Sequence, residues 1–128
     1  MVIIRSFHLG DYKAVSVIFE NSLRPSHMKE TNFSFYRTFY WDSDLVMVAI
    51  LNHVIVGVIV GTIQQNTGIC YRIAVEASFQ QLGIGKSLMS SLVKCFHARK
   101  IFDIEMVIDD MNKEIFTIPR LVFEKRIT

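Results

Sequence analysis

The sequence predicts one domain of the α/β (α+β) class, with a mixed central sheet flanked by helices. Short runs of β-branched residues alternate with stretches in which apolar residues recur every three or four positions. That alternation of strand-like and helix-like segments favours helices packed against a sheet. The 128 residues contain no internal repeat, low-complexity tract or linker, so we expect residues 1–128 to fold as a single unit.

The N-terminal part predicts a strand followed by a helix. Val2–Phe7 is a short apolar run that suits a strand, and Leu9-Gly10-Asp11 supplies a turn and a helix cap. The predicted helix is Tyr12–Leu23, and Pro25 follows its end. Its apolar residues have helical rather than alternating spacing: Ala14, Val15, Val17, Ile18 and Leu23.

The central part predicts three strands. The nineteen residues Leu45–Ile63 are long enough to cross a membrane as a helix, but ten of them are Val or Ile. Because Asn52-His53 interrupts them near the middle, we interpret the segment as a hairpin of two buried strands, Leu45–Leu51 and Val54–Gln64. Asn66-Thr67-Gly68 predicts a second turn before a strand at Ile69–Val75.

The period changes to a helical one after Gly83-Ile84-Gly85. This helix ends at Arg99-Lys100, and one of its faces is apolar: Leu88, Met89, Leu92, Val93 and Phe96. Ile104–Ile108 follows as a strand and Asp109–Ile118 as a helix that ends before Pro119. Val122–Thr128 is predicted to be a terminal strand.

Composition excludes several classes of protein. Lys and Arg number 14 against 12 Asp and Glu, so the net charge of +2 does not indicate a dedicated nucleic-acid binder. The N-terminus lacks the pattern of a signal peptide, and two cysteines, Cys70 and Cys95, are too few for a disulfide-stapled secreted domain. We therefore expect a cytoplasmic protein without a membrane segment. The four histidines lack the spacing of metal ligands, so no metal site is predicted.

The most informative segment is Tyr71–Leu88, which passes from a strand through two glycines, Gly83 and Gly85, into a helix. A glycine-rich loop that opens a helix exposes several backbone N–H groups at the positive end of the helix dipole, an arrangement that suits a phosphate or pyrophosphate. As an alternative, the two glycines form only a tight turn between strand and helix.

Two well-known phosphate motifs do not match this loop. A dinucleotide-binding fingerprint requires a third glycine where Leu88 stands. Gly85-Lys86-Ser87 reproduces the end of a P-loop, but the first glycine of that motif would fall on Gln80.

A third pattern matches. Gln80-Gln81-Leu82-Gly83-Ile84-Gly85 resembles the Gln/Arg-x-x-Gly-x-Gly/Ala signature of the GNAT N-acetyltransferase superfamily. Ile73-Ala74-Val75 upstream, Leu88-Met89 downstream and Asn112 after an apolar strand fit the same family, as does the opening segment with Arg5 and Asp11. The resemblance covers essentially the whole chain and implies an acyl-CoA N-acyltransferase fold.

The resemblance implies that acetyl-CoA is the acyl donor and an amine the acceptor. The backbone of Ile73 and Val75 would pair with the pantetheine arm, with Ala74 between them, and Asn112 would lie along that arm. The pyrophosphate would meet N–H groups of a loop that comprises Gln80, Gln81, Leu82, Gly83, Ile84, Gly85, Lys86 and Ser87. The N–H of Val75 is a candidate to stabilise the negative charge on the carbonyl oxygen.

The sequence identifies no general base. The weak candidates are Glu76, which follows the key strand and has a solvated loop charge as its alternative interpretation, and Tyr71 within that strand. Tyr71 and Arg72 are expected to face opposite sides of the sheet, with simple coverage of the sheet as their alternative role. Asp109-Asp110 is the other acidic pair, with a helix cap as the alternative interpretation. Six aromatic residues at 33–41 stand where the family builds its acceptor side, although most of them are expected to belong to the core.

The chain departs from the family near its C-terminus. Many members carry a tyrosine seven residues after the asparagine, placed to protonate the thiolate of CoA, and Pro119 stands there instead. This favours either transfer without that acid or an alternative function as a weak or inactive acyl-CoA-binding module. The usual last strand is not expected after Val122–Thr128. We predict that the second subunit of a homodimer covers that edge or, as an alternative, that the C-terminal strand is repositioned.

Overall fold

A computed structural model describes residues 1–22 and 43–106, and the structural statements below refer to these residues. The elements in chain order are β1 (Val2–Ser6), the 3-10 turn η1 (Leu9–Asp11), α1 (Tyr12–Ser22), the 3-10 turn η2 (Ser43–Leu45), β2 (Val46–Leu51), β3 (Val54–Gln64), β4 (Thr67–Val75), the 3-10 turn η3 (Ala77–Phe79), α3 (Ile84–Ala98) and β5 (Asp103–Met106).

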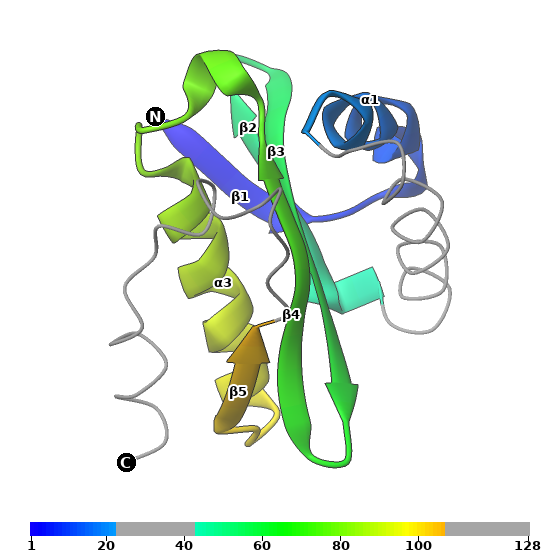
Figure 1. Cartoon of the computed structure of the whole chain (residues 1–128), viewed down its shortest axis with the longest axis vertical. Coiled ribbons are helices and arrows are strands. Elements are labelled where there is room, and N and C mark those ends of the chain that lie inside the picture. Colours follow the sequence, from blue (N-terminus) through cyan, green and yellow to red (C-terminus); the bar gives the residue numbers. More distant parts are fainter. Residues whose placement is uncertain (23–42, 107–128) are drawn as a thin grey trace.

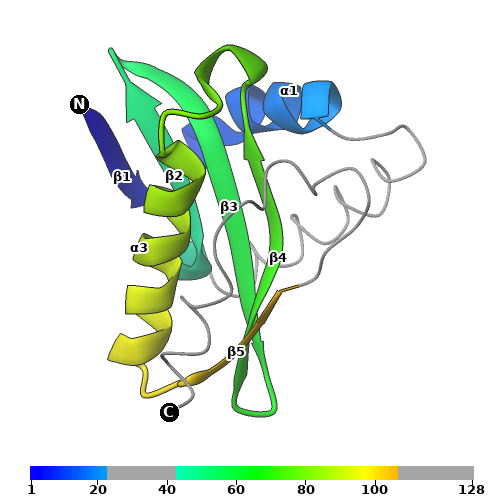
Figure 2. The same ribbon diagram turned by 60° about the vertical axis from the view of Figure 1, so that its left-hand side comes forward.

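The described strands form one sheet in the order β1-β2-β3-β4-β5. Neighbouring strands are antiparallel except for β4 and β5, which are parallel, so the predicted mixed sheet is confirmed. Helix α3 covers one face of the sheet and α1 the other (Figures 1 and 2). The predicted α+β class is therefore confirmed as well.

The two hairpins show one correct and one incorrect turn prediction. Asn52 and His53 lie between β2 and β3, both with positive φ (51° and 67°), as the interrupted apolar run predicted. No helix within the described ranges is long and apolar enough to span a membrane. The second turn is formed by Gln65 and Asn66, with φ of 48° and 70°, and not by residues 66–68. Thr67 already pairs with Gln64 in the ladder, so β4 begins two residues earlier than predicted.

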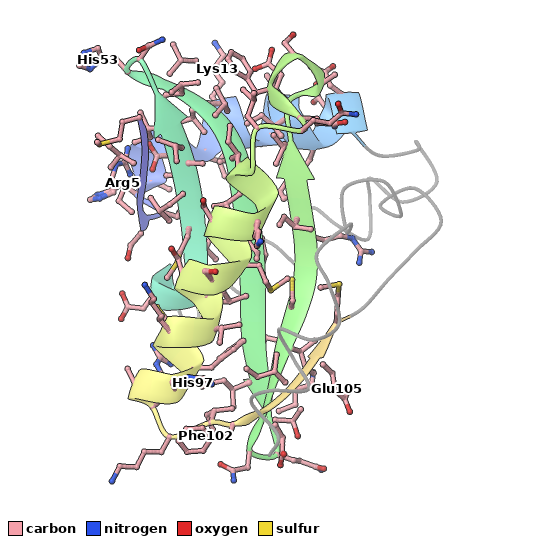
Figure 3. All side chains as sticks on the ribbon, turned by 90° about the vertical axis from the view of Figure 1, so that its left-hand side faces the viewer. Arg5, Lys13, His53, His97, Phe102 and Glu105 are labelled. Atoms are coloured by element: carbon pink, nitrogen blue, oxygen red, sulfur yellow. The ribbon has the colours of Figure 1, made fainter. Side chains whose placement is uncertain are left out.

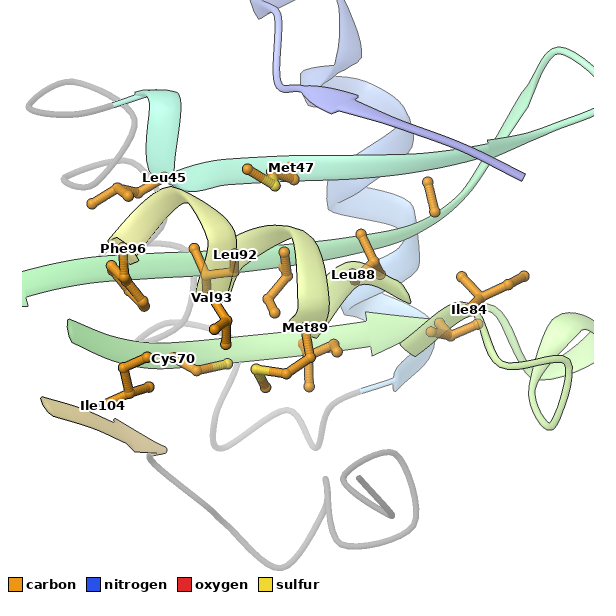
Figure 4. Close-up of a cluster of buried hydrophobic side chains, with 14 of the residues drawn as sticks. Leu45, Met47, Cys70, Ile84, Leu88, Met89, Leu92, Val93, Phe96 and Ile104 are labelled. Carbon is orange, nitrogen blue, oxygen red and sulfur yellow. The ribbon is translucent and has the colours of Figure 1, made fainter. Parts of the chain in front are cut away.

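The larger core lies between the sheet and α3 (Figure 4). The predicted apolar face of the helix is buried there: Leu88, Met89, Leu92, Val93 and Phe96. The helix begins at Ile84, inside the glycine segment, so Gly85 belongs to its first turn. A second cluster on the other face joins α1 to the sheet through residues such as Val15, Phe19 and Val58. Burial on both faces explains why β2 and β3 have near-continuous apolar sequences.

Asp11 organises the start of α1. Its carboxylate accepts two hydrogen bonds from the Arg5 guanidinium, at 2.7 and 3.0 Å, and one from the backbone N–H of His8 at 2.8 Å. The predicted cap is therefore present, with Arg5 as an added partner. Arg5 lies on β1, at one edge of the described sheet (Figure 3). The Arg5 hydrogen bonds lower the pKa of Asp11 from its ordinary value.

Several predictions fall outside the described residues. They are the aromatic segment 33–41, the helix Asp109–Ile118, the terminal strand Val122–Thr128 and the dimer edge expected there. Of the strand predicted at Ile104–Ile108, the structure describes β5, which begins one residue earlier.

Candidate functional site

The C-terminal half of β4 has a strand neighbour on one edge only within the described residues. On one side β3 pairs with β4 as far as Val75, opposite Gly57. On the other side β5 pairs with β4 only from Thr67 to Cys70, which lies opposite Met106. Beyond Cys70 this second edge, which we call the open edge of β4, has no described strand beside it. An open edge presents backbone donors and acceptors to an extended ligand.

The hydrogen-bond pattern shows which residues face the open edge. The N–H of Glu76 donates to Val56 of β3 at 2.8 Å, so the backbone of residue 76 points toward β3. Antiparallel ladders alternate with a period of two, and Ala74 stands opposite Val58. The backbone of Ala74 therefore also faces β3, whereas the N–H and C=O groups of Ile73 and Val75 face the open edge. This is the placement that the pairing role of Ile73 and Val75 requires, and Ala74 contributes only its position between them.

A β-bulge precedes this stretch and changes which way the side chains face. The register passes from Gly61 opposite Cys70 to Val60 opposite Arg72, leaving Tyr71 without a partner. Cys70 packs in the α3-side cluster, while Arg72 is buried opposite Val60 of the α1-side cluster. The bulge therefore places Cys70 and Arg72 on opposite faces, where strict alternation would place them on the same face. The side chain of Tyr71 is outside what the structure describes, so the expectation that Tyr71 and Arg72 face opposite sides stays a prediction.

The loop after β4 is tied back to the strand. Glu76 precedes η3, and the side-chain amide of Gln80 donates a 3.0 Å hydrogen bond to the carbonyl of Val75. This bond was not predicted, because spacing in the sequence does not reveal a contact between a glutamine and a carbonyl five residues earlier. The backbone then adopts the left-handed conformation at Gln81 and again at Gly83, with φ of 69° and 81°. Glycine accommodates this conformation without strain.

The loop delivers free backbone donors at the start of α3. Gly83 is the N-cap, and its carbonyl accepts the N–H of Ser87 at 3.0 Å. The N–H groups of Ile84, Gly85 and Lys86 precede the first bond of the helix and have no partner within it. Ser87 belongs to the predicted donor set, but its N–H is already used, so only its hydroxyl remains for a ligand.

The surface of this loop is accessible while its base is anchored. Gln81, Leu82, Gly83 and Lys86 are exposed, and the side chain of Ile84 is buried in the α3-side core. N–H groups without a partner in the helix, the helix dipole and the Lys86 ammonium together favour a bound anion. The open edge of β4 and this loop adjoin through Val75–Gln80, so one elongated ligand with an anionic part can contact both.

The candidate acid–base residues are only partly placed. Glu76 is half-buried at the end of β4, directly after the two residues with backbone groups at the open edge. Asn112, Asp109-Asp110 and Pro119 lie outside the described residues. Cys70 is not a suitable nucleophile, because complete burial raises the pKa of its thiol far above the ordinary range. Within residues 1–22 and 43–106, no three His, Cys, Asp or Glu residues form a group suited to a metal ion.

Comparison with known proteins identifies the family. The acetyltransferase (GNAT) family model matches residues 14–113, which is most of the chain. The chain belongs to the GNAT acetyltransferase family. An acetyltransferase of Pectobacterium atrosepticum is 32% identical over 114 residues, covering 88% of this chain and 79% of that protein. The GNAT assignment made from the loop with Gly83 and Gly85, which we call the glycine loop (residues 80–87), is thereby confirmed.

Solved structures of other GNAT proteins share the fold. The PaiA N-acetyltransferase of Thermoplasma acidophilum, in complex with coenzyme A, matches with a TM-score of 0.71 at 15% identity over 98% of this chain and 88% of that one. A GNAT family acetyltransferase of Brucella melitensis, in complex with acetyl-CoA, has a TM-score of 0.70 at 16% identity over 85% and 77% of the two chains. At these identities the likeness establishes the fold, and these neighbours bind CoA or acetyl-CoA.

Proposed function

We propose that this GNAT protein is an acetyl-CoA-dependent N-acetyltransferase that acts on a primary amine of a small molecule or peptide. The observation that carries the proposal is the adjacency of the open edge of β4 to a loop with free N–H groups. Pantetheine contains amides that suit a strand edge, and the pyrophosphate of CoA suits a helix N-terminus. The proposal also draws support from family membership and from the CoA-bound neighbours.

The described residues fit this donor. Ile73 offers both backbone groups to the open edge of β4, and Val75 offers its N–H, since its carbonyl is occupied by Gln80. The pyrophosphate would be held by the N–H groups from Gln81 to Lys86, with the Lys86 ammonium nearby. Gly83 leaves open space beside the loop, because a Cβ built there would have no atom within 4 Å. A bulkier residue would fill space that an approaching phosphate needs.

Acetyl-CoA supplies the acetyl group as a thioester that a free amine can attack. Negative charge then develops on the carbonyl oxygen, and the Val75 N–H at the open edge is our candidate to stabilise it. The amine must lose a proton, and Glu76 is the described carboxylate closest in sequence to this point. Glu76 is therefore our candidate general base, and Tyr71 remains a second candidate.

Turnover with a panel of amines tests the proposal. We expect acetyl-CoA, mixed with polyamines, amino-acid amides or short peptides, to release free thiol and give an acetylated product in mass spectra. Heat-treated protein is the control. Absence of product with every amine, although the protein binds acetyl-CoA, would contradict the enzymatic proposal.

The same experiment separates a second candidate function. Pro119 replaces the tyrosine that many family members use as an acid, which favours an acyl-CoA-binding module with weak or no turnover. Binding without product would support this alternative. We favour some activity, because a thiolate is a good leaving group. A cytoplasmic location and a homodimer also remain proposals, to be tested by cell fractionation and by light scattering.

A further inference from the structure

The peptide unit between Val75 and Glu76 is hydrogen-bonded on both sides. Its N–H, which belongs to Glu76, donates to Val56 of β3 at 2.8 Å. Its carbonyl, which belongs to Val75, accepts the side-chain amide of Gln80 at 3.0 Å. One bond therefore fixes the end of β4 to the sheet, and the other fixes it to the loop.

The Gln80 bond closes a compact ring of residues. Between Val75 and Gln80 the chain makes the 3-10 turn η3, with Phe79 N–H donating to Glu76 at 2.8 Å and Gln80 N–H to Ala77 at 3.4 Å. Gln80 itself is half-buried and has extended backbone angles, and the left-handed residues of the glycine loop follow directly. The side chain of Gln80 therefore holds the beginning of that loop against the end of β4.

We propose that Gln80 is a positioning residue that fixes the distance between the open edge of β4 and the glycine loop. This inference rests on the proposed function, in which one CoA molecule contacts both places. A ligand that spans two subsites binds most tightly when the distance between them is already fixed in the free protein, because less conformational entropy is then lost on binding. One N–H of the Gln80 side-chain amide donates to the Val75 carbonyl, and this bond acts on CoA through the position of the loop.

The chemistry of the side chain makes this role specific. Methionine has a similar length but cannot donate a hydrogen bond, so Gln80→Met removes the tie with little change in volume. Arginine retains N–H donors, so Gln80→Arg is the conservative variant that restores the tie. Gln64 is an exposed glutamine at the far end of β3, and Gln64→Met is the matched control.

The test combines calorimetry with hydrogen–deuterium exchange. Loss of one hydrogen bond predicts that Gln80→Met weakens CoA binding about five- to tenfold. We expect the CoA affinity of Gln80→Arg to stay within about twofold of wild type. ADP, which lacks the pantetheine arm, should lose less affinity than CoA in Gln80→Met. In ligand-free Gln80→Met, the hydrogen-bonded amides of Phe79, Gln80 and Ser87 should exchange faster, while those of β2 and β3 should not change.

Three results would overturn the proposal. The first is unchanged CoA affinity in Gln80→Met. The second is an equal loss of affinity for ADP and CoA, which would indicate direct contact with the phosphates. The third is unchanged exchange of the Phe79, Gln80 and Ser87 amides. If wild-type protein binds no CoA, the proposed function fails. Exchange of the ligand-free loop still decides whether Gln80 holds it in place.

Discussion

The main chain of Gly68 in β4 lies directly beneath the aromatic ring of Phe96 in α3. A Cβ built on Gly68 would stand 2.8 Å from the Cγ and Cδ2 atoms of that ring, closer than real side chains approach. Phe96 is completely buried, so a displaced ring would press on its neighbours in a close-packed core. The C-terminal part of α3 therefore sits closer to the sheet than any residue larger than glycine permits.

We predict that Gly68→Ala lowers the free energy of unfolding by about 1–3 kcal/mol, the usual cost of overpacking a core. Gly10→Ala is the matched control, because a Cβ at Gly10 would meet nothing within 4 Å. Urea unfolding measures both variants. Equal stability of Gly68→Ala and Gly10→Ala would show that Phe96 moves aside at little cost.

The ion pair between Arg5 and Asp11 predicts a pH-dependent contribution to stability. Asn at position 11 can still accept the His8 N–H but loses the charge, so Asp11→Asn isolates the ionic part. We expect a loss of about 1 kcal/mol at neutral pH, below the value for a buried pair because the Arg5 side chain is more than a third exposed.

The direction of the pH effect follows from the lowered pKa of Asp11. The contribution is present above the unfolded-state pKa of about 3.9 and is lost as pH falls through the lower folded-state value. Wild type and Asp11→Asn should therefore converge in stability below about pH 3.9. The exposed residue Asp103 provides the control variant Asp103→Asn. A stability difference that stays constant from pH 7 to pH 3 would refute the ionic interpretation.

Substitutions at Gly83 separate backbone strain from blockage of the loop. Gly83 has a positive φ of 81°, which asparagine tolerates far better than valine. We predict that Gly83→Val destabilises the fold by about 1–2 kcal/mol, whereas Gly83→Asn costs less. Both side chains enter the open space beside the loop, so both variants should lose most of their CoA affinity in calorimetry. CoA affinity retained in Gly83→Asn would mean that the loop does not hold the pyrophosphate.

The two cysteines should differ in reactivity. Cys70 is completely buried in the α3-side core, and this burial raises the pKa of its thiol, whereas Cys95 is half-buried on α3. We therefore expect iodoacetamide to modify Cys95 first in the native protein, and Cys70 only as fast as the chain unfolds. Peptide mapping by mass spectrometry measures both rates, with labelling in urea as the reference. Native Cys70 that reacts as fast as Cys95 would contradict the described core.

The sequence predicted those parts of the fold that depend on hydrophobic period and local turn chemistry. The apolar face of α3 was predicted correctly because a buried helix face requires apolar residues at helical spacing. The turn at Asn52-His53 was predicted correctly because only certain residue types readily adopt the left-handed backbone of a tight turn. The turn between β3 and β4 was predicted, but it lies at Gln65-Asn66 and not at residues 66–68, because Gly68 belongs to β4 and packs against Phe96.

The candidate site was predictable to a similar extent. The glycine signature located the loop and its family, and at Gly83 the glycine meets a local requirement for left-handed backbone. The bulge that separates Cys70 from Arg72 and the tie from Gln80 to Val75 were not predictable, because each depends on how β4 meets its neighbours. Asn112 and Pro119 lie outside the described residues, so their roles stay predictions.

A calorimetric titration of the wild-type protein with CoA tests the central claim most directly. We predict saturable binding of one CoA per chain with a dissociation constant in the micromolar range or tighter, and loss of that binding in Gly83→Val. No binding at high micromolar CoA, by a wild-type chain shown to be folded, would contradict both the transferase and the binding-module forms of the proposal.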